Sequence, residues 1–327
     1  MTSRSVCCPP DGAAPMHRTI EITVLPEAAD VLIAALQDIE HVVGVARQRG
    51  ASVQPAGCDV VVVHALNRGT DAVMRSVADA AARHGGPFSV ATAELASLSD
   101  PEHQSAIDRD VDEALWEEME AGMRHQGRVS PNFLALMTLG GAIAAAGLVS
   151  HDPVLQSVAT IAAAVIAPGF EPIAKIPLGL VLRRLEVAKL GLLSSLAGYA
   201  VLAAAAAAAF LALWAGGAIR PDDFFAGPAA EHLAHPSAPD LLISFCGALA
   251  GIVIQAAYRR SVIAGALIAM RMIDAAAALG ISVAAGQPAF AMQALERLGL
   301  DVAFILVAGA GVFWVKQQMV HRRTPLH

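Results

Sequence analysis

The pattern of hydrophobic and polar positions changes once along the chain, near residue 129. Before that point, short segments alternate between apolar and polar positions or repeat them with helical spacing, and after it long apolar stretches follow one another with few charges. About 20 consecutive apolar residues are enough to cross a bilayer, so the pattern predicts a water-exposed N-terminal part and a membrane-spanning remainder. The predicted parts are a disordered tail (1–16), a folded domain (17–96), an amphipathic acidic linker helix (97–128) and a transmembrane domain (129–320).

Residues 17–96 combine both kinds of short pattern. Alternation predicts strands, and apolar positions three and four apart predict helices. The predicted strands cover 18–25, 41–48, 58–66 and 87–95, and the predicted helices cover 26–39 and 70–85. The resulting order βαββαβ is that of α+β ferredoxin-like domains, which ACT-type ligand-binding domains share. Because this arrangement hosts many functions, both a ligand sensor and a docking or oligomerising module fit it.

The segment 100–128 places apolar residues four positions apart, with Trp116 beside them and acidic residues on the other faces. The apolar positions are Ile107, Val111, Leu115, Met119 and Met123. This spacing predicts one amphipathic helix that links the two parts of the chain. Its acidic face fits a solvated surface, and a docking surface for a partner subunit is the alternative.

Six apolar stretches follow, and each is close to the length of a transmembrane helix. They cover 129–150, 153–182, 190–219, 241–258, 261–285 and 290–315. A shift of 108 residues places Pro131 on Pro239 and residues 190–192 on residues 298–300, both Leu-Gly-Leu, although few other positions match. Three spans in each half fit the inverted repeat of many transporters, because the second half then enters the membrane from the opposite side.

Basic residues outside the spans predict the orientation. Ten lie on one side of the membrane, and two, Arg220 and Arg297, lie on the other. The ten are Arg124, Arg128, Arg183, Arg184, Lys189, Arg259, Arg260, Lys316, Arg322 and Arg323. Cytoplasmic loops carry the excess of Lys and Arg, so both termini and the βαββαβ domain are predicted to lie in the cytoplasm. The expected location is the plasma (inner) membrane of a bacterium.

The composition agrees with a membrane protein and narrows the function. The chain is 56% hydrophobic and 16% charged, whereas about 25% of the residues of soluble proteins are charged. The net charge of −7 comes from acidic residues before residue 130, and no basic patch for nucleic acid is present. The four cysteines lack the spacing of a metal site, and the motifs of soluble enzymes are absent. We therefore expect no enzyme, metal or cofactor; the expected partners are the lipid bilayer, a small solute or ion, and a second copy of the chain.

Proline and glycine interrupt the second apolar stretch near its middle. Pro168, Gly169 and Pro172 disfavour an unbroken helix, because proline lacks the backbone N–H and clashes with the preceding turn. Glu171 and Lys175 lie four apart and share a helix face. Broken helices that carry charge at membrane depth are typical of substrate or ion sites. The alternative is a kinked helix in which Glu171 and Lys175 neutralise one another while Lys175 reaches the cytoplasmic interface.

Two charges, Arg271 and Asp274, interrupt the fifth stretch at the same depth. Each such residue costs roughly 2.5 to 3.5 kcal/mol at a helix centre. Their spacing of three permits a pair on one face, which fits either a pair that holds the bundle together or a coupled ion or proton site. If the halves pack as inverted repeats, this pair meets Glu171 and Lys175 in one polar centre. Asp301, early in the sixth stretch, either joins this centre or faces the outer headgroups.

The run from Ser130 to Ile173 resembles the hallmark of a bacterial membrane family, the domain of unknown function 389. In that hallmark an SPNF-like start leads through a helix to an IAP-x-x-x-P-I-like break, which the residues around Pro168 match. Glu171 stands in place of a small residue, and Ile273-Asp274 in place of a proline pair. The resemblance covers most of residues 17–316 and implies the fold. It implies no activity, because none is assigned to the family.

Two functions fit these patterns. The first is a membrane protein that binds or transports a small solute or ion at a midplane site and is regulated by its cytoplasmic domain. The candidate site residues are Pro168, Gly169, Glu171, Pro172, Lys175, Arg271, Asp274 and Asp301. The second is a non-transporting scaffold that docks partners through the cytoplasmic domain and the acidic helix. Hydrated polar residues at mid-depth favour the first function, and sealed pairs among these charges favour the second.

Overall fold

The chain divides into two compact units, one up to Glu113 and one from Ala114. In the computed structural model the described residues are 17–95, 97–110, 113–126, 128–220, 222, 224–257, 262–319 and 321–322, and the side chains of residues 125, 126, 228, 229 and 262–270 are outside the description. The predicted disordered tail, residues 1–16, therefore lies outside the described residues.

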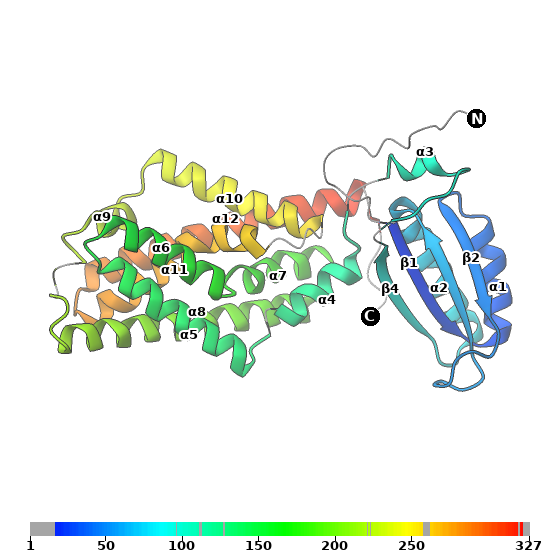
Figure 1. The fold of residues 1–327 in the computed structure, drawn as a ribbon, viewed down its shortest axis with the longest axis horizontal. Helices are drawn as coiled ribbons and strands as arrows, with labels where there is room; N and C mark the ends of the chain where they lie inside the picture. The colour runs from blue at the N-terminus through cyan, green and yellow to red at the C-terminus, as the bar shows by residue number, and fades with distance from the viewer. Residues whose placement is uncertain are drawn as a thin grey trace, which may run out of the picture. The chain divides into compact units, whose positions relative to one another are not determined.

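The first unit is a four-stranded antiparallel sheet with two helices (Figure 1). Its elements are β1 (His17–Val24), α1 (Pro26–Gln37), β2 (Val42–Gln48), β3 (Asp59–Ala65), the single turn η1 (Asn67–Gly69), α2 (Thr70–His84) and β4 (Ser89–Leu95). The strand order is β2-β3-β1-β4, and every neighbouring pair is antiparallel. The predicted order of strands and helices is confirmed.

Alternation along the two central strands builds the core of this unit. Ile20 and Ile22 of β1 are buried, whereas Glu21 between them is exposed. They lie opposite Val63 and Val61 of β3 in the antiparallel register, so four branched side chains line one face of the sheet. The helices α1 and α2 pack against each other and cover this face. The period of two therefore determines which face carries the helices.

The predicted single helix over residues 100–128 is wrong. Two helices occur among the described residues of this segment, α3 (Gln104–Ile107) and α4 (Trp116–Gln126). Asp110, between them, accepts the backbone N–H of Asn67 at 2.6 Å, a bond to a different part of the first unit. This bond ties the segment after α3 to the η1 turn of the first unit.

The second unit is a bundle of helices (Figure 1). Its helices after α4 are α5 (Pro131–Leu148), α6 (Pro153–Ile166), α7 (Phe170–Val181), α8 (Leu185–Ala215), α9 (Pro228–Ala234), α10 (Ala238–Ala256), α11 (Val262–Ala284) and α12 (Pro288–Met319). Among the described residues, four helices, α5, α8, α10 and α12, are long and apolar enough to cross a membrane. The pair α6 and α7 makes a fifth if it counts as one bent span. The remaining predicted span, the fifth (261–285), corresponds to α11 and is not among these helices, so the count of six stays a prediction.

The helix contacts of the two halves correspond. In the first half α8 packs on α5 and α7, and in the second half α12 packs on α10 and α11. Across the halves, α8 packs on α11 and α12 packs on α7. Exchanging α5 to α8 for α10 to α12 reproduces these contacts, whereas the contact of α11 with α5 has no counterpart between α10 and α6 or α7 among the described residues, so the internal correspondence is partial.

Glycines let three helices approach closely in the bundle. A Cβ atom added at Gly141 of α5 would lie 2.3 Å from the carbonyl oxygen of Leu202 on α8. One added at Gly280 of α11 would lie 2.0 Å from the carbonyl oxygen of Ala203, the next residue of α8. Small residues at membrane helix contacts permit such backbone approach. The position of α8 between α5 and α11 therefore depends on these two glycines.

The helix α4 belongs to the bundle. The indole N–H of Trp116 donates to the carbonyl oxygen of His321 at 3.0 Å, and Lys316 of α12 donates to the carbonyl oxygen of Ala256 at 2.9 Å. Lys316 is thus buried within α12, although the sequence analysis assigned it to a cytoplasmic loop. Of the predicted apolar face of the linker, Trp116, Met119 and Met123 are buried in the bundle, Ile107 lies in α3, and Val111 lies outside the described residues.

Candidate functional site

The second predicted span is broken where the prolines predicted it. The helix α6 ends at Ile166, α7 begins at Phe170, and the two axes differ by 48°. Pro168 has no N–H to donate to the carbonyl oxygen of Ala164, so the α6 hydrogen-bond ladder ends there. Pro172 lies in the first turn of α7, where a missing N–H costs no bond within the helix. The break itself therefore comes from Pro168 and Gly169.

Tyr199 of α8 fills the break and connects it to the middle of α11. Its hydroxyl donates to the carbonyl oxygen of Gly169 at 3.3 Å and lies 3.7 Å from the sulfur of Met272. A Cβ atom at Gly169 would lie 2.7 Å from this hydroxyl, so glycine leaves the room that Tyr199 occupies. The sequence analysis did not single out Tyr199. A signal was present, because a tyrosine in the middle of an otherwise apolar span must place its hydroxyl against a polar partner.

The predicted pair between Arg271 and Asp274 does not form. Arg271 donates instead to the carboxylate of Asp240 on α10, with a distance of 2.9 Å between Nη2 and Oδ1. Asp240 also forms a capping box with Ser237 at the start of α10. In the sequence the base precedes the acid, which is the less favourable order for a pair on one helix. The arginine therefore joins α11 to α10.

Asp274 has a different partner on a different helix. Its carboxylate accepts a hydrogen bond from the hydroxyl of Thr160 on α6, at 3.3 Å. No basic side chain pairs with Asp274 among the residues that the structure describes. The helix α11 is continuous through this position, so the charges interrupt the apolar sequence of the fifth stretch but not its helix. Asp274 is thus a carboxylate near the middle of α11, held by the hydroxyl of Thr160 in the middle of α6.

Glu171 and Lys175 do not pair with each other within the described part of the chain. Lys175 is only 1% exposed, so it does not extend to the cytoplasmic interface, and its ammonium nitrogen has no hydrogen-bond partner among the described residues. Its Cβ faces α8, where a Cβ atom at Gly191 would lie 2.8 Å from it. The contact of α7 with α8 directs Lys175 into the bundle. The kinked helix with a self-neutralising pair is therefore wrong, as is one polar centre of four charges.

Asp301 belongs to a second buried pair. It bonds to Arg297, one turn earlier on α12, with 3.0 Å between Nη2 and Oδ1, and both side chains are buried. Arg297 also donates to the hydroxyl of Ser244 on α10. The assignment of Arg297 to an outer loop is wrong, and so is an Asp301 that faces headgroups. The spacing of four between these residues was visible in the sequence and predicts such a pair.

The structure thus divides the predicted site residues among separate contacts. It brings the α6–α7 break and the middle of α11 together through Tyr199, and it joins the middle of α6 to α11 through Thr160 and Asp274. It directs Arg271 to α10, Lys175 toward α8, and Asp301 to its own helix. Within the described ranges, no group of three or more His, Cys, Asp and Glu side chains has a metal-binding arrangement.

Length and composition of the helices, with charge placed at their centres, define a membrane protein with a separately folded sheet unit. Residues 164–307 match the family model described as a domain of unknown function, DUF389, and this match supports membership of that family. The matched range begins near the end of α6 and ends in α12, so it contains all eight candidate residues and leaves out the sheet unit. Comparisons with curated proteins and with solved structures find no match.

Proposed function

We propose that this protein binds a proton or a small cation at Asp274 and moves it across the membrane. The observation that carries the proposal is the carboxylate of Asp274, which has a hydroxyl and no base as its partner among the described residues. A charge at the centre of a membrane helix is costly, and such residues mark ion pathways and proton relays. A proton or a cation neutralises this carboxylate, and no arginine does so.

The two arginines of the bundle centre are already engaged. Arg271 binds Asp240, and Arg297 binds Asp301. These pairs leave Asp274 as the remaining carboxylate on α11 and α12 with a polar but uncharged partner. An anion is the less suitable substrate for this position, because it would face the carboxylate at close range.

The α6–α7 break supports a transport site at this depth. Discontinuous helices at the midplane supply backbone groups that coordinate ions in transporters, and their halves are related by inverted repeats. Pro168 leaves the carbonyl oxygen of Ala164 without its usual helical donor. The corresponding contacts of the two halves support an inverted repeat of three spans each.

The sheet unit is assigned a regulatory role in this proposal. Its antiparallel order β2-β3-β1-β4 and its βαββαβ sequence agree with a ferredoxin-like, ACT-like domain. The excess of basic residues on one side of the predicted spans supports a cytoplasmic position for this unit and for both termini.

A second candidate function is a scaffold that transports nothing. The observation in its favour is the sealed pair of Arg297 and Asp301, in which two charges neutralise each other inside the bundle. Buried pairs of this kind can hold a structure together without any ligand. The two functions differ in what they require of Asp274, since a scaffold has no use for its charge.

Ion flux into vesicles separates the two. The full-length protein is reconstituted into liposomes that contain dyes for protons, sodium and potassium, and flux is followed after a gradient is imposed. Asp274→Asn keeps the shape and the bond to Thr160 and removes the charge. Loss of a charged binding group costs about 1.5–3 kcal/mol, which corresponds to a loss of flux of roughly tenfold or more. The control is Glu296→Gln on the exposed face of α12, which should leave flux unchanged.

Two results contradict the proposal. Wild-type vesicles that conduct none of the three ions faster than empty vesicles favour the scaffold. If the Asp274→Asn and Glu296→Gln variants conduct the ion as fast as the wild-type protein, Asp274 is not the ion site.

A further inference from the structure

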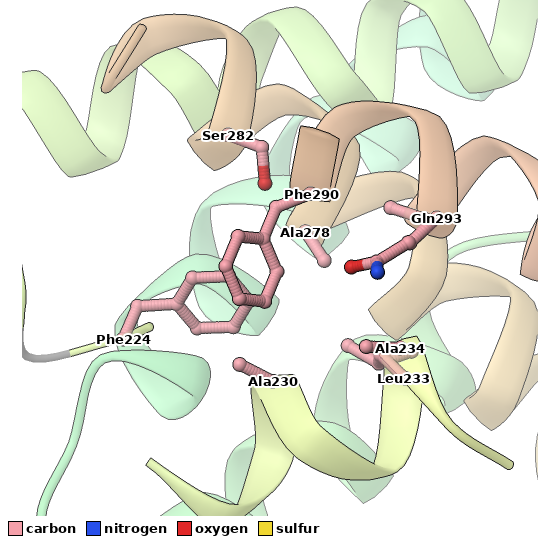
Figure 2. Close-up of a pocket in the computed structure, with 9 residues that line it drawn as sticks. Phe224, Ala230, Leu233, Ala234, Ala278, Ser282, Phe290 and Gln293 are labelled. Carbon is pink, nitrogen blue, oxygen red and sulfur yellow. The ribbon is translucent and has the colours of Figure 1, made fainter. Parts of the chain in front are cut away.

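We propose that a small cavity between α9, α11 and α12 holds one internal water molecule, which bridges Ser282 of α11 to Gln293 of α12. The cavity has a volume of about 10 Å³ and is bounded by Phe224, Leu233 and Phe290 on its apolar sides. Figure 2 shows the hydroxyl of Ser282 and the amide of Gln293 directed into this space from two helices. The inference holds whether or not the protein transports an ion.

The polar atoms at the cavity lack protein partners. Ser282 is 1% exposed, and its hydroxyl oxygen has no hydrogen-bond partner among the described residues. The side-chain carbonyl oxygen of Gln293 is likewise buried without one. Leaving a buried polar group unsatisfied costs roughly 1–3 kcal/mol, so such groups in folded proteins are normally satisfied by protein or water. Two such atoms on facing helices therefore indicate a shared partner.

The size and lining of the cavity identify this partner as water. A cavity needs about 10–15 Å³ to hold one water molecule, and the water needs two to four polar neighbours. No charged side chain is among the described residues that line the cavity, so these residues offer no counter-charge to a metal ion or an anion. A water molecule can donate to the carbonyl oxygen of Gln293 and share a second hydrogen bond with the hydroxyl of Ser282.

The water stands at the end of a polar stripe on α12. Gln293, Arg297 and Asp301 follow one another at intervals of four, which places them on one helix face. The second terminal nitrogen of Arg297, Nη1, is also buried without a hydrogen-bond partner among the described residues. The bridge between Ser282 and Gln293 thus links α11 to the same face of α12 that carries the buried pair.

Hydroxyl-radical footprinting by a short X-ray pulse detects bound water, because the radicals form from it and oxidise adjacent side chains. Phe224 lines the cavity and is 2% exposed, and Phe210 is 0% exposed in the apolar core of the same bundle. In the full-length protein we expect oxidation of Phe224 to be severalfold faster than that of Phe210. The double variant Ser282→Ala with Gln293→Leu removes both polar partners and should bring Phe224 down to the rate of Phe210.

Two outcomes overturn the inference. In the wild-type protein, equal rates for Phe224 and Phe210 mean that the cavity is dry, and this comparison needs no variant to fold. Undiminished oxidation of Phe224 in the folded double variant means that the radicals come from bulk water.

Discussion

Asp274 differs from two other carboxylates of the bundle, Asp240 and Asp301, in the charge of its partner. Asp240 and Asp301 each bind an arginine, whereas Asp274 binds the hydroxyl of Thr160. A buried carboxylate with a base beside it is neutralised by the protein, and one without a base depends on a proton or a cation. This difference at a single residue is the basis of the proposed function.

A residue of the sheet unit gives a prediction about pH. The carboxylate of Asp59 accepts hydrogen bonds from the backbone N–H of Gly50 at 2.7 Å and from the Arg47 guanidinium at 2.6 Å. These two bonds lower the pKa of Asp59 below its usual value, and they outweigh burial, which raises the pKa. Because the pKa of Asp59 is lower in the folded state, Asp59 stabilises the unit at pH values above about 4, the ordinary pKa of Asp. This contribution to stability is lost as the pH falls through the folded-state pKa.

Hydrogen exchange of the full-length protein tests this prediction. Protection of the β2–β3 amides, corrected for intrinsic rates, should fall as the pH drops below about 4. In Asp59→Asn the protection should be lower at neutral pH and should change less over the same interval. Equal pH profiles for the two proteins would sink the assignment to Asp59.

Partners of charged residues were the part of the site that the sequence could not supply. The sequence identified Arg271, Asp274 and Lys175 as charges within apolar stretches, because hydropathy is a local property. Their partners lie on helices that are distant in sequence, and long side chains reach several of them. The helix that packs beside α11 therefore determines whether a charged residue of α11 pairs within its own helix or with a neighbouring helix.

At the scale of elements, close helix packing gives a second prediction. Gly280→Ala places a methyl group 2.0 Å from the Ala203 carbonyl oxygen, so α8 and α11 must move apart. Overpacking of this kind costs about 1–3 kcal/mol, and the midpoint of thermal unfolding in detergent should fall. Gly299→Ala on α12 is the matched control, because its added methyl group meets nothing within 4 Å. It should leave the midpoint unchanged or raise it, since alanine is the better helix former. Equal midpoints for both variants would contradict the packing of α11 on α8.

Elements with a local cause were predictable, and those with a tertiary cause were not. The α6–α7 break follows from the missing N–H of Pro168, which any environment would impose. The prediction of one linker helix was wrong because helical spacing is a local signal, whereas the bond from Asn67 to Asp110 comes from a distant segment. Periodicity therefore identified the buried face of α4 but not the interruption before it.

At the scale of the whole molecule, the predicted orientation can be tested by labelling. The connections α5–α6, α8–α9 and α11–α12 lie at one end of the bundle, and the α7–α8 turn lies at the other (Figure 1). In a cysteine-free background, cysteines at Asp152, Ala226 and Gln287 should react with an impermeant thiol reagent added outside intact cells. A cysteine at Arg184 should react only after the cells are opened. Labelling of position 184 from outside would contradict the six-span arrangement with cytoplasmic termini.

The order of elements in the sheet unit could be predicted from the sequence, because strand alternation is a strong local signal. The Arg297–Asp301 pair was missed although its spacing was present, since Arg297 was placed in a loop before the start of α12 was known. Thr160 and Tyr199 were missed because a single hydroxyl in an apolar helix leaves no periodic signal.

Carbodiimide labelling of the protein in lipid vesicles tests the central claim about Asp274 most directly. Dicyclohexylcarbodiimide modifies carboxyl groups in apolar surroundings, and peptide mass spectrometry separates Asp274 from Asp301. Because Asp301 is held by Arg297 and Asp274 is held only by Thr160, the account predicts faster modification of Asp274. A higher concentration of the ion that the vesicles conduct should slow this modification. Modification of Asp274 that is no faster than that of Asp301, or that no ion and no change of pH affects, would contradict an ion-binding role.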